Sequence, residues 1–265
     1  MAETRKRIRV GVLGAGGRMG QAVIAAVGAD ARLKLSGAIE RAGHPSIGTG
    51  LGGDLTICSN PAALAHASDV LIDFTSPDAL DATLDAACEG RTALLIGTTG
   101  LSAASHKAID RAAKSVAVLQ AANTSLGVTL LLRLVELAAA QLGPEWDIEI
   151  AELHHGLKVD APSGTALALG EAAAKGRGAP LAKLRAPPRE TAARARTAGH
   201  IGFASLRGGS AAGDHNVLFL GNGERLELRH HAETRDIFAR GAVAAAAWLG
   251  RQPPGRYTMA DVLGG

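Results

Sequence analysis

Apolar runs alternate with stretches of helical spacing over the first half of the chain. Five of these runs are short and bounded by polar turns, which is typical of buried strands; they cover residues 7–13, 33–40, 69–75, 92–100 and 116–123. Helical patterns lie between them, over residues 21–28, 78–89 and 102–114. Strands that alternate with helices predict a parallel sheet with helices on both faces. We therefore expect an α/β fold with a Rossmann-type N-terminal domain, residues 1–123.

The pattern changes after Asn123, where longer helices and strands of alternating polarity follow. The expected elements are a helix over 127–142, a half-buried strand over 146–155, a helix over 163–176, antiparallel strands over 201–209 and 215–232 with a hairpin turn at 221–224, and a last helix over 236–250. They predict a second, α+β domain with a mixed sheet, residues 124–235. Residues 175–198 are rich in Ala, Arg, Lys and Pro and are expected to form a long mobile loop.

The composition narrows the class of protein. The chain has 265 residues, of which 47% are hydrophobic, so one large or two small domains can bury a proper core. Aromatic residues make up 3%, which argues against stacking platforms for single-stranded nucleic acid. The net charge of +3 is too small to indicate a nucleic-acid partner, but it is compatible with an anionic small molecule.

The cysteines and the first residues of the chain indicate in which cellular compartment we expect the protein. Cys58 and Cys88 do not make a disulfide framework and are interpreted as ordinary thiols in a reducing compartment. The start of the chain is basic and then apolar, but its apolar run is too short and glycine-broken for a signal peptide. No stretch reaches the length of a membrane span, so we expect a soluble cytoplasmic protein without a membrane partner.

A glycine-rich turn follows the first expected strand and precedes the first helix. In "GAGGRMG", Gly14, Gly17 and Gly20 allow a backbone turn to approach a pyrophosphate at a helix N-terminus. Glu40 ends the next strand, twenty residues beyond Gly20, where an acid accepts hydrogen bonds from ribose hydroxyls. Arg41 is placed to pair with a 2′-phosphate, so both NADH and NADPH are expected as cofactors. The alternative is a plain strand–turn–helix whose glycines serve packing.

Two further polar turns, "IGTTG" (96–100) and "AANTS" (121–125), sit where parallel strands end. Ligands of this architecture bind at the carboxyl ends of the strands, so both turns are candidates for nicotinamide contact. Each is also compatible with a simple strand end.

The stretch "ELHHGLKVDAPSGTA" (152–166) concentrates polar chemistry. Adjacent histidines on a strand point to opposite faces, which argues against His154 and His155 as paired metal ligands, and we expect no metal site. Ser163 is a natural helix N-cap, and the following N–H groups of Gly164 and Thr165 offer an anion site. An anion site beside Lys158 and an imidazole resembles a carboxylate clamp next to a general acid. Ordinary surface or core histidines are the alternative.

Taken together, these motifs resemble the dihydrodipicolinate reductase family of the diaminopimelate–lysine pathway. The matching stretches include "GAGGRMG", "IDFTSP", "IGTTG", "ELHHGLKVDAPSGTA" and "GERLELRHHA", and they occur in family order over nearly the full length. The resemblance implies that NAD(P)H gives a hydride to a cyclic imine dicarboxylate, 4-hydroxy-tetrahydrodipicolinate, which loses water and yields tetrahydrodipicolinate.

The resemblance also implies roles for single residues. His154 would protonate the ring, Lys158 would be a second proton donor that holds the substrate, and His155, Ser163, Gly164 and Thr165 would lie at the substrate carboxylates. The cofactor would lie on Gly14, Ala15, Gly16, Gly17, Arg18, Met19, Glu40, Arg41, Gly97, Thr98, Thr99, Ala121, Ala122, Asn123 and Thr124. The family further implies a homotetramer assembled through the sheet of the second domain, with residues 236–265 packing back on the first.

The chain departs from the family pattern at two places. Thr124 stands where the family often has an aromatic residue, which removes a ring from the nicotinamide side. The loop 176–198 keeps arginines without the usual glycines, so no site residue is assigned there. Arg235 matches an arginine near the domain hinge and is given a structural role.

Two other functions stay open, namely another two-domain dehydrogenase for an amino acid or sugar and a non-catalytic NAD(P)-sensing regulator.

Overall fold

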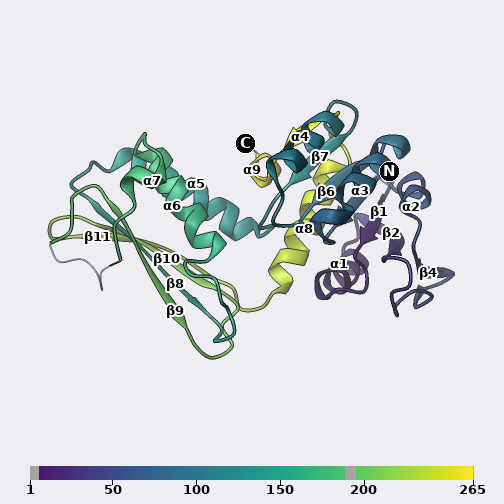
Figure 1. Ribbon diagram of the computed structural model, residues 1–265, viewed down its shortest axis with the longest axis horizontal. Coiled ribbons are helices and arrows are strands. Elements are labelled where there is room, and N and C mark those ends of the chain that lie inside the picture. Colours follow the sequence, from purple (N-terminus) through teal and green to yellow (C-terminus); the bar gives the residue numbers. More distant parts are fainter. Residues whose placement is uncertain (1–5, 189–194, 265) are drawn as a thin grey trace, which may run out of the picture. The chain divides into compact units, whose positions relative to one another are not determined.

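The computed structural model describes residues 6–188 and 195–264, and the chain divides into two compact units. Unit 1 comprises residues 1–126 and 236–265, and unit 2 comprises residues 127–235. Figure 1 shows both units, with most of their helices and strands labelled.

Unit 1 is built around an eight-stranded sheet of the described residues, in the order β12-β7-β6-β5-β1-β2-β4-β3. Its strands are β1 (Ile8–Leu13), β2 (Leu33–Ile39), β3 (Gly50–Gly52), β4 (Leu55–Cys58), β5 (Val70–Asp73), β6 (Ala93–Ile96), β7 (Ala117–Gln120) and β12 (Gly255–Tyr257). The described pairings are parallel except that of β3 with β4. The predicted Rossmann-type sheet is confirmed, and β3, β4 and β12 extend it at its edges.

Helices cover both faces of this sheet. They are α1 (Arg18–Ala29), α2 (Pro61–Ala67), η1 (Pro77–Ala79), α3 (Leu80–Gly90), α4 (Ala103–Ala112), α8 (Asp236–Leu249) and α9 (Met259–Val262). The α-helices are labelled in Figure 1. Apolar residues of α1 and α8 belong to one core cluster of the sheet, and those of α2, α3 and α4 belong to the other. The central strands β1, β5 and β6 are buried on both sides, which explains why their sequences are continuous apolar runs.

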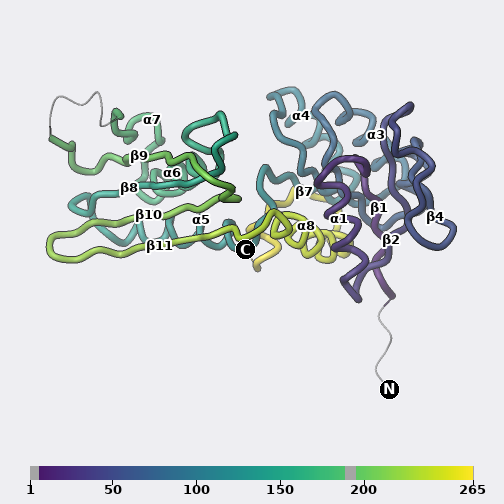
Figure 2. The backbone as a smooth tube through the Cα atoms, turned by 90° about the horizontal axis from the view of Figure 1, so that it is seen from below, coloured from purple at the N-terminus to yellow at the C-terminus, as the bar shows by residue number. Residues whose placement is uncertain are grey.

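Unit 2 is a four-stranded sheet in the order β11-β10-β8-β9, drawn side by side in Figure 2. Its elements are α5 (Leu126–Gln141, which begins at the last residue of unit 1), β8 (Asp147–His154), α6 (Gly164–Gly176), α7 (Leu181–Leu184), β9 (Ile201–Arg207), β10 (Asp214–Leu220) and β11 (Arg225–His231). Buried and half-buried residues alternate along β8, so one face meets the apolar side chains of α5 and α6. Phe219 of β10 is fully buried in this core.

The prediction that β9 is antiparallel is wrong. β9 pairs with β8 in parallel, from Ile148 with Ile201 to His154 with Arg207. The chain leaves β8 and crosses back through α6 before it enters β9. A crossover of this kind returns the chain in the same direction, which a hairpin cannot do. The antiparallel hairpin of β10 and β11 forms as predicted, with Leu220 paired to Arg225.

The segment predicted as a loop over 175–198 has more structure than expected. Its first residues end α6, α7 follows, and Arg185 forms a bridge with Ile201. Arg196 is anchored by ion pairs to Asp147 and Glu149 of β8. Residues 189–194 of this segment lie outside the described residues. Within the described ranges, no helix has the length and apolar character needed to cross a bilayer.

Candidate active site

The glycine turn of unit 1 closes tightly against the start of α1. Gly14 has a φ of +80°, and its carbonyl oxygen accepts the N–H of Gly17 at 3.0 Å. A Cβ at Gly20 would collide with that same oxygen, so glycine is required for the helix to start so close to the turn. Gly17 is the N-cap of α1, and Arg18 lies exposed in its first turn. The first N–H groups of a helix carry positive potential, which suits an anion such as pyrophosphate.

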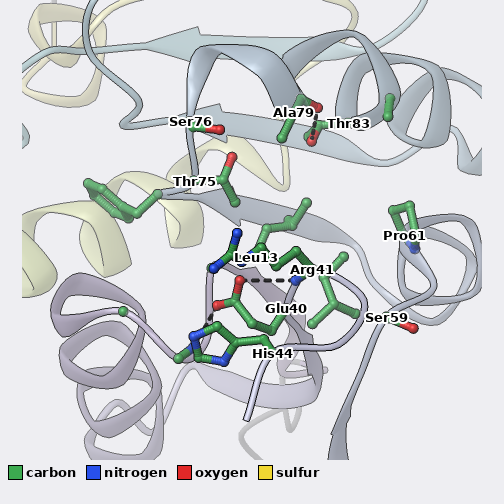
Figure 3. Close-up of a pocket in the computed structure, with 16 residues that line it drawn as sticks. Leu13, Glu40, Arg41, His44, Ser59, Pro61, Thr75, Ser76, Ala79 and Thr83 are labelled. Carbon is green, nitrogen blue, oxygen red and sulfur yellow. Dashed lines mark hydrogen bonds between the residues drawn. The ribbon is translucent and has the colours of Figure 1, made fainter. Parts of the chain in front are cut away.

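A cavity of about 520 Å³ opens beside this turn and is lined in part by Glu40 and Arg41 (Figure 3). The Glu40 carboxylate accepts the N–H of Gly16 at 2.9 Å and that of Arg41 at 3.0 Å. These two bonds use one acceptor position on each oxygen, and further positions remain for hydroxyl donors. The Arg41 guanidinium is exposed and has no ion-pair partner in the described part of the chain.

His44 lines the same cavity and was missed by the sequence analysis. Its Nδ1 accepts the backbone N–H of Ser46 at 3.2 Å, and the Ser46 hydroxyl lies 2.7 Å from the same nitrogen. Because a backbone N–H only donates, the proton of the neutral ring is on Nε2. The ring lies against Gly16, where a Cβ would collide with it. No periodicity in the sequence marks His44, because it follows the strand in an irregular turn.

The other predicted cofactor residues follow β6 and β7, which are neighbours in the sheet. Ala121 donates its N–H to Ile96 at 3.0 Å, so the two turns leave the sheet side by side. The Thr98 hydroxyl is buried and donates to Asp73 at 3.3 Å, whereas Thr99 is exposed. The Thr124 hydroxyl is also buried and donates to the carbonyl of Phe238 at 2.7 Å. Thr124 therefore fastens this turn to α8.

In unit 2, Glu152 and His154 lie on the same buried face of β8. The Glu152 side chain is 0% exposed, and its Oε2 lies 2.5 Å from Nδ1 of His154. Its Oε1 accepts the N–H of Ser163 at 3.2 Å. One carboxylate thus contacts both the imidazole and the residue that caps α6.

Arg207 of β9 balances the charge of Glu152. Its two terminal nitrogens donate to the two carboxylate oxygens, each at 2.8 Å. Burial alone would raise the pKa of Glu152, but hydrogen bonds from Arg207, Ser205 and His154 outweigh that effect and hold the pKa at about 2. Glu152 is therefore ionised at neutral pH.

His215 of β10 completes the buried group. Its ring meets that of His154 edge to face, with centroids 5.2 Å apart, and its Nε2 lies 3.1 Å from the Ser163 hydroxyl. Burial, and then the neighbouring His154, lower the pKa of His215 to about 4. The Ser163 hydroxyl also accepts the N–H of Ala166 at 3.1 Å, which makes it the N-cap of α6.

The remaining predicted residues of this stretch are held by other partners. Lys158 pairs with Asp160 at 2.8 Å, and this contact lowers the pKa of the Asp160 carboxyl. Arg235 donates to Nε2 of His155 at 3.0 Å. Hydrogen bonds to Glu152 therefore bring His154 and Ser163 together, whereas His155 and Lys158 lie in the loop that joins them. Among the described residues, no three His, Cys, Asp or Glu side chains are grouped as metal ligands would be.

Known proteins resemble the chain over nearly its whole length. Two family models match it, "Dihydrodipicolinate reductase, N-terminus" over residues 8–124 and "Dihydrodipicolinate reductase, C-terminus" over residues 127–263. The chain belongs to the dihydrodipicolinate reductase family. Curated relatives named 4-hydroxy-tetrahydrodipicolinate reductase are 51% identical in Zymomonas mobilis and 49% identical in Brucella abortus. The alignments cover 97% of both chains for the first and 96% of this chain and 97% of the relative for the second.

Solved structures agree with this family. A dipicolinate-bound dihydrodipicolinate reductase from Paenisporosarcina sp. TG-14 has a TM-score of 0.79 and 25% identity, with 96% of this chain and 98% of that chain covered. A probable dehydrogenase from Thermotoga maritima shares the fold, with a TM-score of 0.62, 12% identity, and 96% and 92% covered. The chain is thus an oxidoreductase of the dihydrodipicolinate reductase family, and its N-terminal half carries that family's nucleotide-binding domain.

Three residues around His154 were not predicted from the sequence, namely Glu152, Arg207 and His215. Glu152 could have been found, because residues two apart on a strand share a face and His154 follows at that spacing. Arg207 and His215 come from β9 and β10, and only the strand register brings them to β8.

Proposed function

We propose that the chain reduces 4-hydroxy-tetrahydrodipicolinate to tetrahydrodipicolinate with NADH or NADPH, in the diaminopimelate–lysine pathway. The observation that carries this proposal is the placement of His154 beside the N-terminus of α6, joined to it through Glu152. A dicarboxylate at a helix N-terminus, next to an imidazole, meets a proton donor and an anion site together.

The cofactor fits the geometry of unit 1. When bound, the nicotinamide supplies the hydride. The glycine turn, residues 14–17 with Arg18 and Met19, faces the pyrophosphate, because its glycines leave the backbone accessible at the start of α1. Glu40 accepts from the ribose and Arg41 pairs with a 2′-phosphate. The nicotinamide end would be held by Gly97 to Thr99 and by Ala121 to Thr124. Hydrogen bonds from the hydroxyls of Thr98 to Asp73 and of Thr124 to α8 hold these two turns in place.

On the substrate side, His154 would donate a proton to the ring of the substrate, which loses water when it is reduced. Lys158 holds the substrate and is a second donor, which requires that the substrate displace its exposed partner Asp160. His155, Gly164 and Thr165 bind the carboxylates. Ser163 contributes by capping α6, which directs the first N–H groups of the helix toward the ligand.

The assembly and location belong to the same proposal. We infer a cytoplasmic homotetramer that forms through the sheet of unit 2. Leu206 of β9 supports this assembly, because it is 59% exposed beside its paired neighbour Leu153, on the face that does not carry the buried Glu152. An apolar side chain on an open sheet face is a site for association with a second copy.

The first test is NADPH oxidation with substrate made in place from pyruvate and aspartate semialdehyde by a dihydrodipicolinate synthase. Oxidation should need both precursors. The variant His154→Ala should lower kcat by about 10²–10⁴-fold with cofactor binding retained, because a placed proton donor contributes that much. Lys158→Ala should damage both kcat and substrate KM.

The matched control is His66→Ala, since His66 is an exposed histidine of α2 whose ring contacts the carbonyl of Ala62 in its own helix. It should keep wild-type kinetics. Intact cofactor binding without oxidation would mean that the substrate is a different one, and wild-type rates for His154→Ala would overturn the assignment of the acid.

A further inference from the structure

Glu152 is a buried charge whose carboxylate contacts groups from several segments of unit 2. Arg207 alone would neutralise it through two bonds of 2.8 Å. The carboxylate nevertheless also meets the His154 ring and the backbone of Ser163. The remaining lone pairs of a buried carboxylate need donors, and here those donors are the ring of His154 and the residue that caps α6.

The charge state of Glu152 determines the tautomer of His154. An ionised carboxylate only accepts hydrogen bonds, so the contact at 2.5 Å places a proton on Nδ1 of His154. Nε2 is then the nitrogen that gives up or takes a proton. A Cβ at Gly213 would lie 2.9 Å from Nε2, so the glycine keeps the side of the ring next to Nε2 open.

Arg207 extends the same network to the loop that carries Lys158. Besides Glu152, one terminal nitrogen donates to the carbonyl of Asp160 at 2.6 Å. The guanidinium side chain is 19% exposed and comes from β9, the strand that runs parallel to β8. His154, the N-cap of α6 and this loop are therefore all hydrogen-bonded to the ion pair of Glu152 and Arg207.

We propose that Glu152, held by Arg207, is a positioning residue. It fixes the tautomer and orientation of His154, and it fixes the position of His154 relative to the N-terminus of α6. The expected effect on kcat rests on the proposed function, whereas the tautomer and orientation of His154 do not. Glu152 touches neither substrate nor cofactor in this role, and acts through the imidazole that it orients.

The test compares Glu152→Gln with wild type in the coupled assay. An amide places an N–H group against Arg207 or His154, both of which also donate, and in either orientation the imidazolium loses its anionic acceptor. We expect kcat to fall by about 100-fold, the low end of what proton transfer contributes. The alkaline limb of the pH–rate profile should move to lower pH, because the protonated ring loses the neighbouring anion, while KM for NADPH stays within about twofold. Glu152→Asp retains the carboxylate and should restore the profile in part.

The matched control is Glu149→Gln on the same strand. Glu149 also pairs with an arginine, Arg196 at 3.1 Å, but lies on the opposite face of β8 from His154. Its variant should keep wild-type kcat and pH profile. An unchanged kcat and profile in Glu152→Gln would overturn the proposal.

A second measurement does not depend on activity or on the folding of a variant. The ¹⁵N shifts of the His154 ring in the wild-type protein should show a protonated Nδ1 throughout the neutral range. An Nε2-protonated neutral ring would overturn the proposal even in an active enzyme. Wild-type protein without reductase activity but with a protonated Nδ1 would instead contradict the proposed function and support the positioning of His154.

Discussion

His215→Gln should make unit 2 less sensitive to acid. Burial, and then His154, lower the pKa of His215 to about 4, from an ordinary value of 6.5. As the pH falls, the unfolded chain takes up this proton before the folded protein does. The stability contributed by a neutral His215 is therefore complete above about pH 6.5 and is lost between that pH and about pH 4.

The magnitude follows from the two values. The difference between 6.5 and about 4 corresponds to about 3 kcal/mol in all, of which about 2 kcal/mol is lost between pH 7 and pH 4.5. Glutamine removes the titration and keeps an N–H donor for the Ser163 hydroxyl. Glu152 does not affect the comparison in this pH range. Its pKa of about 2 lies below the ordinary 4.5, so the stability that the ionised carboxylate contributes is lost only as the pH falls from about 4.5 toward 2.

The assay uses the positions of the two tryptophans. Trp146 packs against the core of unit 2, and Trp248 packs in unit 1. In a Trp248→Phe background, tryptophan fluorescence during urea unfolding reports unit 2 alone. Between pH 7 and pH 4.5, the free energy of unfolding should fall in both proteins. The decrease should be about 2 kcal/mol smaller in His215→Gln than in the parent. Equal losses in both proteins would show that folded His215 binds its proton as readily as an unfolded histidine, and the reasoning would fail.

Two further predictions concern the two halves of the site. Gly213→Ala should lower kcat by at least about tenfold without changing KM for NADPH, because the new Cβ lies 2.9 Å from Nε2 of His154 and hinders proton transfer. Gly223→Ala, at a hairpin position of φ +85° with open space around it, controls for backbone strain and should keep kcat. Arg41→Ala should raise KM for NADPH about fivefold, the effect of about 1 kcal/mol from an exposed ion pair, and leave KM for NADH within about twofold. Equal effects on both cofactors would refute contact between Arg41 and a 2′-phosphate.

The sheet of unit 1 was predictable because its central strands are buried on both sides. All four residues of β5 and of β6 are buried, and such runs stand out in a sequence without reference to their neighbours. β3 and β12 are only three residues long, and each forms by pairing with the edge of a sheet that already exists. Their sequences, "GLG" and "GRY", carry no periodicity of their own.

The site was predictable only where its residues are close in the sequence. His154 ends a strand and Ser163 begins a helix nine positions later, so one stretch reveals both. Arg207 and His215 reach the site through pairings that depend on the crossover of α6 and on the register of β10. The mistaken direction of β9 would have placed its residues in the opposite order along β8, and Arg207 would not have been assigned beside His154.

The ion pair of the buried Glu152 with the half-buried Arg207 is better explained by catalysis than by stability. Burial of two charges costs about as much as their attraction returns, and well-packed apolar replacements of such pairs are often neutral or stabilising. Unit 2 already has an apolar core around Phe219 that could extend to this position. An apolar side chain at position 152, however, would leave Nδ1 of His154 without an acceptor and the N–H of Ser163 without its partner. The charge at Glu152 is therefore required by the two groups that it orients, and removing it should cost more in kcat than in the free energy of unfolding.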